Sequence, residues 1–197
     1  MSHFIYQTEG FILKREYWNE IDLRLLVLTR ELGLLWVEAK GIRVLKSKLR
    51  YHLNLYSLAN FSLISTKADY WRLVGVETIS QNSPFLFSIS RRFLVANWSS
   101  LINRLLGQRD KYSSLYDDLI ACLFILANRE LTIDQIKSLE IVFNLRLLSH
   151  LGYRPLPKFC QEFLAVDDWQ TKAISIEKNK RQAFIREINE SINLTNL

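Results

Sequence analysis

The residue types that most often perform catalysis or bind metals are few in this chain and widely spaced. Its 197 residues include three histidines, His3, His52 and His150, and two cysteines, Cys122 and Cys160. The histidines have no spacing typical of a metal site, and two cysteines without a CxxC pattern do not build a zinc ribbon. His150 lies near the end of a helical pattern, and we interpret it as a helix-end or core residue. The sequence therefore indicates neither a metal ion nor a cofactor.

Common enzyme motifs do not occur in the sequence. The chain has no GxxxxGK[ST], GxGxxG or GxSxG pattern, which argues against the common phosphate-binding loops and the nucleophile elbow of hydrolases. Paired carboxylates occur at residues 117–118 and 167–168, but adjacent acids on a helix point apart. We interpret them as helix caps or surface residues, and we expect a protein that is not an enzyme.

A basic segment at residues 39–50 is the clearest functional pattern. Five of these twelve residues are Lys or Arg and none is acidic, and Gly41 interrupts the segment just after a predicted strand. Such a segment can lie along a polyphosphate without repelling it, so our hypothesis is that nucleic acid contacts the protein here. The alternative is a solvated basic loop. Together with basic residues on the first two predicted strands, the candidate DNA-binding residues are Lys14, Arg15, Arg24, Lys40, Arg43, Lys46, Lys48 and Arg50.

Aromatic residues are interleaved with this basic set. Exposed aromatic rings stack on nucleobases, at about 1–3 kcal/mol per base. We expect at least half of these rings to lie in the core instead of at a surface. They are Tyr17, Trp18, Trp36, Tyr51 and Tyr56.

The composition indicates a globular protein with an acidic partner. Apolar residues make up 49% of the chain, which is enough for a substantial core. The net charge of +6 and the pI of about 9.4 favour nucleic acid or an anionic protein tail. We find no disulfide framework, no signal peptide and no apolar segment near about 20 residues. We expect a cytoplasmic, nucleoid-associated protein.

The first 80 residues have the alternation of β-strands, with one helical stretch. Five strands with a helix between the third and the fourth have the order of an OB barrel, a small closed sheet that often binds single-stranded nucleic acid. An SH3-like barrel is the competing interpretation. The strands are predicted at residues 4–17, 23–30, 35–39, 57–65 and 70–79, and the helix at residues 47–56.

Helical periodicity begins after residues 82–84. Ser83 suits the N-cap of a helix and Pro84 its first position. Apolar residues then recur at helical spacing in three stretches, and Gly107 is predicted to cap the first of them. The short connections between these stretches favour antiparallel packing.

The third helical stretch and the end of the chain have signals of their own. Thr132 followed by Gln135 forms a capping-box pattern. We expect a short strand at residues 173–176 and a helix at residues 178–192. The predicted class is α+β, with an OB-fold barrel at residues 1–80 followed by an all-α helical domain at residues 81–197.

The order of several short motifs resembles the bacterial RecO family of recombination mediators. Each motif is weak alone, but their sequence along the chain is fairly specific. The resemblance is best over residues 4–80 and continues through residues 90–160 by helix layout. It is carried by Gly10-Phe11-Ile12-Leu13-Lys14, Tyr17-Trp18-Asn19-Glu20-Ile21-Asp22, Arg30-Glu31-Leu32-Gly33-Leu34, Ala39-Lys40-Gly41-Ile42-Arg43, Lys46-Ser47-Lys48-Leu49-Arg50 and Leu151-Gly152-Tyr153-Arg154-Pro155.

The resemblance implies a non-enzymatic role in DNA repair and homologous recombination, in the RecF pathway. Proteins of this family have an OB domain and a helical domain, bind single- and double-stranded DNA and anneal complementary strands. They contact RecR and the C-terminal tail of single-stranded-DNA-binding protein (SSB), and help to load RecA on SSB-coated DNA. The alternative from the residues alone is a protein-interaction adaptor with an OB-like barrel and little affinity for DNA.

This sequence departs from the family pattern near its end. Many members carry four zinc-binding cysteines after the Gly-Tyr turn, whereas here only Cys160 follows it. We therefore predict no zinc site in a short, irregular C-terminal segment. An acidic SSB tail that ends in an apolar residue needs a groove beside an arginine, and the candidates in the helical domain are Arg91, Arg92, Arg104 and Arg146.

Overall fold

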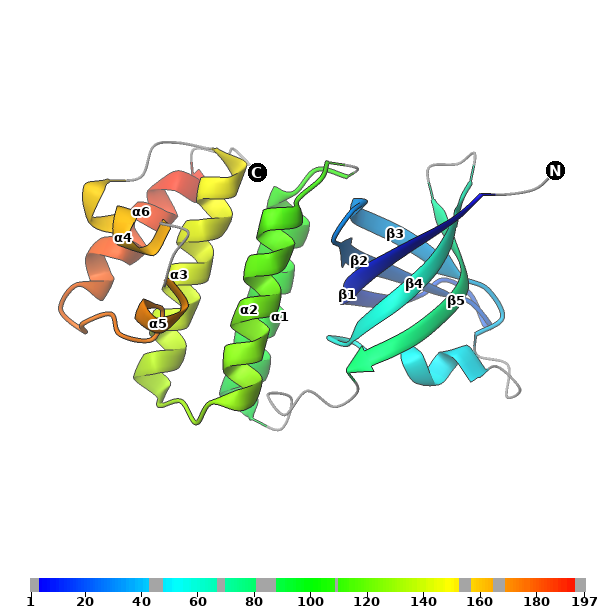
Figure 1. Cartoon of the computed structure of the whole chain (residues 1–197), viewed down its shortest axis with the longest axis horizontal. Coiled ribbons are helices and arrows are strands. Elements are labelled where there is room, and N and C mark those ends of the chain that lie inside the picture. The colour runs from blue at the N-terminus through cyan, green and yellow to red at the C-terminus, as the bar shows by residue number, and fades with distance from the viewer. Residues whose placement is uncertain are drawn as a thin grey trace. The chain divides into compact units, whose positions relative to one another are not determined.

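The computed structural model describes residues 4–42, 48–66, 70–80, 88–108, 110–152, 157–164 and 169–193. The chain divides into two units, drawn in Figure 1. The barrel unit lies within Met1–Ser83 and Leu106–Ser113, and the helical unit lies within Pro84–Leu105 and Ser114–Leu197.

Five strands close into a barrel in the first unit (Figure 1). Their order around the barrel is β1-β2-β3-β5-β4, and β1 pairs with both β2 and β4. Of the five strand pairs that close the barrel, the β3–β5 pair is parallel and the other four are antiparallel. This is the strand order of an OB fold, so the predicted fold class is confirmed. The strands are β1 (Ile5–Tyr17), β2 (Leu23–Thr29), β3 (Gly33–Ala39), β4 (Leu58–Ser65) and β5 (Trp71–Ser80).

The barrel interior is filled by apolar side chains at alternate positions of the strands. On β2, Leu23, Leu25 and Val27 all belong to the buried interior cluster, as the two-residue period of a strand requires. The pairing of β1 with β2 shifts register between Ile12 and Lys14. Such a bulge bends a strand, and here it lies where β1 passes from one partner to the other.

Gly10 lies where β1 pairs with both of its neighbours. It pairs with Thr29 of β2 and with Ala59 of β4. A Cβ atom at this position would lie 2.6 Å from Val27 Cγ1 and 3.1 Å from Phe61 Cε2. The close packing of the interior around Gly10 therefore leaves no space for a side chain.

A short 3₁₀-helix, η1 (Lys48–His52), stands in the place of the helix predicted at residues 47–56. Ile42 before it and Leu53 after it are fully buried in the interior cluster, and Leu49 packs against that cluster. The His52 Nδ1 atom lies 2.8 Å from Thr78 Oγ1 of β5. This segment therefore packs its apolar residues against the barrel interior.

The helical unit is built around α3 (Figure 1), which packs against α1, α4 and α6. Thr132 and Gln135 form the predicted capping box at its start, and Gly152, with φ 65°, caps its end. The helices are α1 (Ile89–Leu105), α2 (Ser113–Asn128), α3 (Ile133–Leu151), η3 (Lys158–Cys160), α4 (Gln161–Leu164), α5 (Trp169–Lys172) and α6 (Arg181–Asn193).

Two local predictions made for the second half of the chain are wrong. Gly107 lies beyond the end of α1 and does not adopt a positive φ, so it is not a left-handed cap. No strand forms at residues 173–176, because the chain continues the turn of α5: the Ala173 amide donates to Trp169 O at 2.8 Å. The predicted helix at residues 178–192 is confirmed as α6. Ser83 and Pro84 lie outside the described residues.

Candidate nucleic-acid interface

The basic residues of the first two strands extend from two faces of the barrel. Residues directly opposite each other in an antiparallel pair share a face. Arg15 lies opposite Leu25, an interior residue, and therefore extends from the inner face at the exposed end of β1. Lys14 lies opposite Leu26, which is not part of the interior cluster. The predicted strand residues are thus not gathered on one side.

A row of alternating charges crosses four strands on the outer face. Glu16, Arg24, Glu38 and Arg72 are successive register partners on β1, β2, β3 and β5. The Arg24 Nη2 atom lies 3.3 Å from Glu38 Oε1. Lys14 also lies beside this row, with its Nζ atom 2.5 Å from Glu16 Oε1. Because positive and negative charges alternate, this row gives little net attraction for a phosphate.

Arg24 is held between two aromatic rings. Its Cζ atom lies 3.1 Å from the centroid of the Trp18 ring and 4.3 Å from that of Tyr70. Only 14% of the Arg24 side chain is exposed. The guanidinium therefore has a fixed position, with its charge balanced by Glu38 and shared with two rings.

The turn between β1 and β2 is joined to the start of the basic segment. Asp22 Oδ1 accepts a hydrogen bond from the Gly41 amide at 2.6 Å, and Asp22 Oδ2 accepts one from Asn19 Nδ2 at 2.7 Å. The hydrogen bond from Gly41, followed by that from Asn19, lowers the pKa of Asp22. Gly41 has φ 64°, a conformation that glycine adopts readily. The turn thus fixes the direction in which the chain leaves β3.

A small hollow lies beside this turn. Its volume is about 190 Å³, and its lining combines one large aromatic ring with positively and negatively charged side chains. Lys40 is exposed at its rim. The lining residues are Trp18, Asn19, Asp22, Leu23, Glu38 and Lys40.

The η1 helix provides the other described part of the basic segment. Lys48 is exposed, and Arg50 is half-buried. The Arg50 guanidinium lies over the Tyr51 ring at 4.7 Å and donates a hydrogen bond to Tyr51 Oη at 2.5 Å. A basic residue and an exposed aromatic ring are therefore neighbours here, a combination that is common in proteins that bind single-stranded nucleic acid.

The remaining predicted residues have mixed outcomes. Arg43 and Lys46 lie outside the described residues. The expectation that at least half of the five interleaved aromatic rings are core is wrong, because Tyr17, Trp18 and Tyr51 are exposed. Trp36 and Tyr56 are only partly buried.

The set of DNA-binding candidates predicted from the sequence does not include two exposed arginines of the barrel unit. Arg30 follows β2, and Arg72 lies in the outer row of β5. The alternation of β5 places Arg72 opposite in direction to the buried Leu73, and this signal was available in the sequence.

The four candidate arginines of the helical unit differ in their surroundings. Arg91 joins α1 to the end of α2, since its guanidinium donates to Leu126 O at 2.6 Å and to Arg129 O at 3.0 Å. Arg92 and Arg104 are exposed on α1. Arg92 and Arg104 therefore present their side chains at the surface, and the structure shows no such anchoring contact for them among the described residues.

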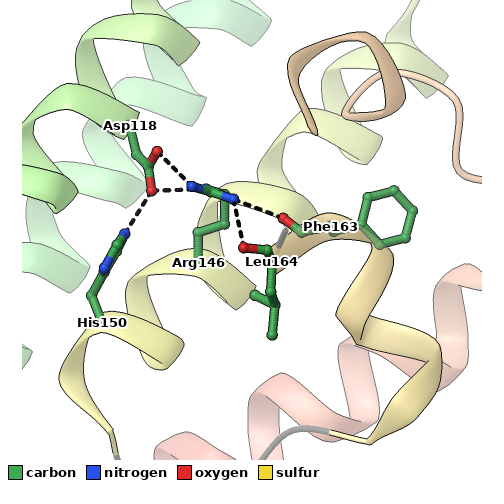
Figure 2. Close-up of polar contacts among 5 residues, drawn as sticks. All are labelled: Asp118, Arg146, His150, Phe163 and Leu164. Carbon is green, nitrogen blue, oxygen red and sulfur yellow. Dashed lines mark hydrogen bonds and ion pairs between the residues drawn. The ribbon is translucent and has the colours of Figure 1, made fainter. Parts of the chain in front are cut away.

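Arg146 belongs to a buried polar network (Figure 2). Its guanidinium donates to both carboxylate oxygens of Asp118, at 2.8 and 2.9 Å, and to Phe163 O at 3.0 Å. It also lies over the Trp169 ring at 4.3 Å. His150 Nε2 lies 2.7 Å from Asp118 Oδ2. This placement argues against Arg146 as a binder of an external carboxylate, because its donors join α2, α3 and α4 internally.

Among the described residues, no cluster of three or more His, Cys, Asp and Glu side chains has the arrangement of a metal site. Cys122 and Cys160 are both buried and form no disulfide with each other. Burial raises the pKa of the Cys122 thiol well above its usual value. None of the described helices has the length and apolar character to cross a membrane.

Two family profiles match the chain in the order of its two units. The profile "Recombination protein O N terminal" matches residues 1–81, and "Recombination protein O C terminal" matches residues 87–162. The chain belongs to the RecO family. The barrel with its basic segment thus corresponds to the N-terminal part of a RecO protein, and α1, α2 and α3 fall in the C-terminal part.

Curated relatives of this RecO-family chain are named "DNA repair protein RecO". The protein of Enterobacter sp. (strain 638) is 30% identical over 146 residues, which is 73% of this chain and 59% of the relative. That of Thermoanaerobacter sp. (strain X514) is 28% identical over 153 residues, covering 76% and 58%. That of Alkaliphilus metalliredigens (strain QYMF) is 24% identical over 155 residues, covering 76% and 59%. The chain therefore spans less than two thirds of the length of these relatives.

Proposed function

We propose that this chain acts as a non-enzymatic mediator of DNA repair and homologous recombination. In this proposal it binds single- and double-stranded DNA through the barrel unit and anneals complementary strands. The observation that carries the proposal is the match of both RecO profiles, in order, over residues 1–81 and 87–162. The exposed basic and aromatic side chains at the β1–β2 turn and on η1 support it.

The proposed DNA contacts are the predicted basic residues, and we expect them to contribute unequally to the affinity for DNA. Lys40 and Lys48 are exposed, and Arg50 is carried on the same 3₁₀-helix as Lys48. Arg15 is exposed at the end of β1. Lys14 and Arg24 already have acidic partners, so we expect weaker contributions from them. Arg43 and Lys46 complete the proposed set from the same segment.

The test is a salt titration of DNA binding and a strand-annealing assay. Each phosphate contact on a single strand adds about 0.7 to the slope of log affinity against log salt. Replacing Lys40, Lys48 and Arg50 together by Ala should therefore reduce this slope by up to about 2, and should slow annealing. The matched control replaces three exposed lysines of the helical unit, Lys158, Lys172 and Lys178. Equal slopes in wild type and the barrel variant would refute the proposed DNA face.

We also propose that the chain helps to load RecA with RecR on SSB-coated DNA. The SSB tail is acidic and ends in an apolar residue, so an exposed arginine beside an apolar surface suits it. Arg92 and Arg104 on α1 are the exposed candidates, and Phe93 beside Arg92 is exposed as well.

A short acidic peptide that ends in Phe tests this contact. Replacing Arg92 or Arg104 by Ala should weaken peptide binding, while Arg186→Ala on α6 should leave it unchanged. If the wild-type chain does not bind the peptide at micromolar concentration, the SSB contact is removed from the proposal without affecting the DNA contact.

A further inference from the structure

Trp18 combines exposure with a fixed position. Its side chain is 56% exposed, although Arg24 covers one face of the ring at 3.1 Å. The Trp18 amide donates to Asp22 O at 3.2 Å, which ties it to the turn. An aromatic ring held in this way stacks on a ligand without first losing conformational entropy.

The support behind Trp18 is itself rigid. Arg24 is enclosed by the Tyr70 ring at 4.3 Å and by Glu38 at 3.3 Å. Because Glu38 balances its charge, Arg24 serves mainly as packing for the indole, which agrees with the weaker phosphate contact expected of it. A cation over one face of the ring leaves the other face for a second planar group.

The hollow beside Trp18 has the size of one base. Its volume is about 190 Å³, which is below the range of about 300–1,000 Å³ that is usual for pockets of drug-sized ligands. This space suits a single planar ring better than a base pair. Bases in a duplex are already stacked and paired, and extruding one costs a few kcal/mol, so the hollow would favour an unpaired base.

The polar groups around the hollow match the edges and the backbone of a nucleotide. The carboxylate oxygens of Asp22 and Glu38 have lone pairs beyond their bonds to Gly41, Asn19 and Arg24, and the exocyclic amines of cytosine and adenine are donors. Lys40 adds a positive charge at the rim, where it can meet the phosphate attached to the bound base.

We propose that the hollow beside Trp18 binds one unpaired nucleobase, stacked on the face of the indole that Arg24 leaves free. This site gives the chain a preference for single strands over duplex DNA at equal phosphate contact. The inference rests on the proposed function, since it assigns a base-binding position within the DNA face of the barrel.

The experiment compares Trp18→Ala, Trp18→Phe and wild type in the full chain. Affinity is measured by fluorescence anisotropy for a mixed-sequence single strand, for a strand of equal length made of abasic sites, and for the duplex. Trp18→Ala should weaken single-strand binding by about 5- to 150-fold, the range for loss of one stacked base, and should change duplex and abasic-strand binding by less than about 2-fold. Trp18→Phe should restore most of the affinity.

Phe124→Ala is the matched control, because it removes another exposed aromatic ring, which belongs to the helical unit. It should leave all three affinities unchanged. The abasic strand tests the same point with wild-type protein alone: wild type should bind the abasic strand more weakly than the intact strand. Equal binding of the two strands by wild type overturns the inference.

An equal loss by Trp18→Ala on single strand, abasic strand and duplex, or no loss on any of them, also overturns it. If wild type binds none of the three DNAs at low salt, the proposed function fails. If wild type binds them with the expected salt dependence but Trp18→Ala matches it throughout, only the base site fails.

Discussion

Replacing Asp118 by Asn should strongly destabilise the helical unit. The side chains of Asp118 and Arg146 are only 9% and 8% exposed, so water screens their charges little. Asn keeps the shape of Asp, but it removes the negative charge and one of the acceptor oxygens that face Arg146 and His150. Removing one partner of a buried ion pair costs about 3–5 kcal/mol. We expect the free energy of unfolding of this unit to fall by about that amount.

Urea unfolding followed by far-ultraviolet circular dichroism measures this loss, because the helices dominate the signal. Arg186→Ala is the control, since Arg186 and Glu190 form an exposed ion pair four residues apart on α6. Exposed helix pairs contribute about 0.3–0.5 kcal/mol, so the control should stay within that range.

A double variant separates the buried charge from the loss of contacts. Asp118→Asn combined with Arg146→Met removes both charges, so no uncompensated charge stays buried. The double variant should therefore be less destabilised than the sum of the two single variants. A loss below about 1 kcal/mol for Asp118→Asn, or strict additivity in the double variant, would refute this account of the network in Figure 2.

Acid pH, the barrel glycine and the cap of α3 provide three further expectations. Burial alone would raise the pKa of Asp118, but the hydrogen bonds from His150 and Arg146 outweigh it, so the pKa is lowered. Because the folded pKa lies below the unfolded one, this carboxylate stabilises the fold above about pH 4 and loses that effect as pH falls toward the folded pKa. Urea midpoints measured across pH should therefore fall in acid, and less steeply for Asp118→Asn. Gly10→Ala should destabilise the barrel by about 1–3 kcal/mol, seen as a lower urea midpoint in near-ultraviolet dichroism, and an unchanged midpoint would contradict the 2.6 Å approach of its Cβ to Val27. Thr132→Ala should cost about 1 kcal/mol of helical-unit stability by urea unfolding, while Thr132→Ser should not, since serine also caps well; equal losses would argue against a capping role.

The sequence predicts the elements of both units because each buries one face. The alternation on β2 and the helical stripes on α2 and α3 depend on local spacing alone, and so does the capping box at Thr132. The strand expected at residues 173–176 failed because four residues carry too little pattern. There, contacts within the helical unit bury Ala173 and Ile176 without a strand.

The surroundings of the charged residues were much less predictable. Arg24 and Arg146 look like ordinary exposed cations in the sequence, because their acidic partners lie on other elements. One signal was available: Asp118 stands three residues after Leu115 and four before Cys122, so it lies on the apolar stripe of α2. A carboxylate on such a stripe requires a buried cation. No comparable signal singles out Trp18, whose setting depends on Arg24 and on the distant Tyr70.

The strand β1 pairs with two neighbours, as every strand of this closed barrel does, so removing β1 would open the barrel. Backbone amides and carbonyls of β2 and of β4 are both satisfied by β1. If proteolysis or a late translation start removed this strand, two bare edges would open together, and unpaired edges recruit other chains. Loss of β1 is therefore expected to promote aggregation of the chain.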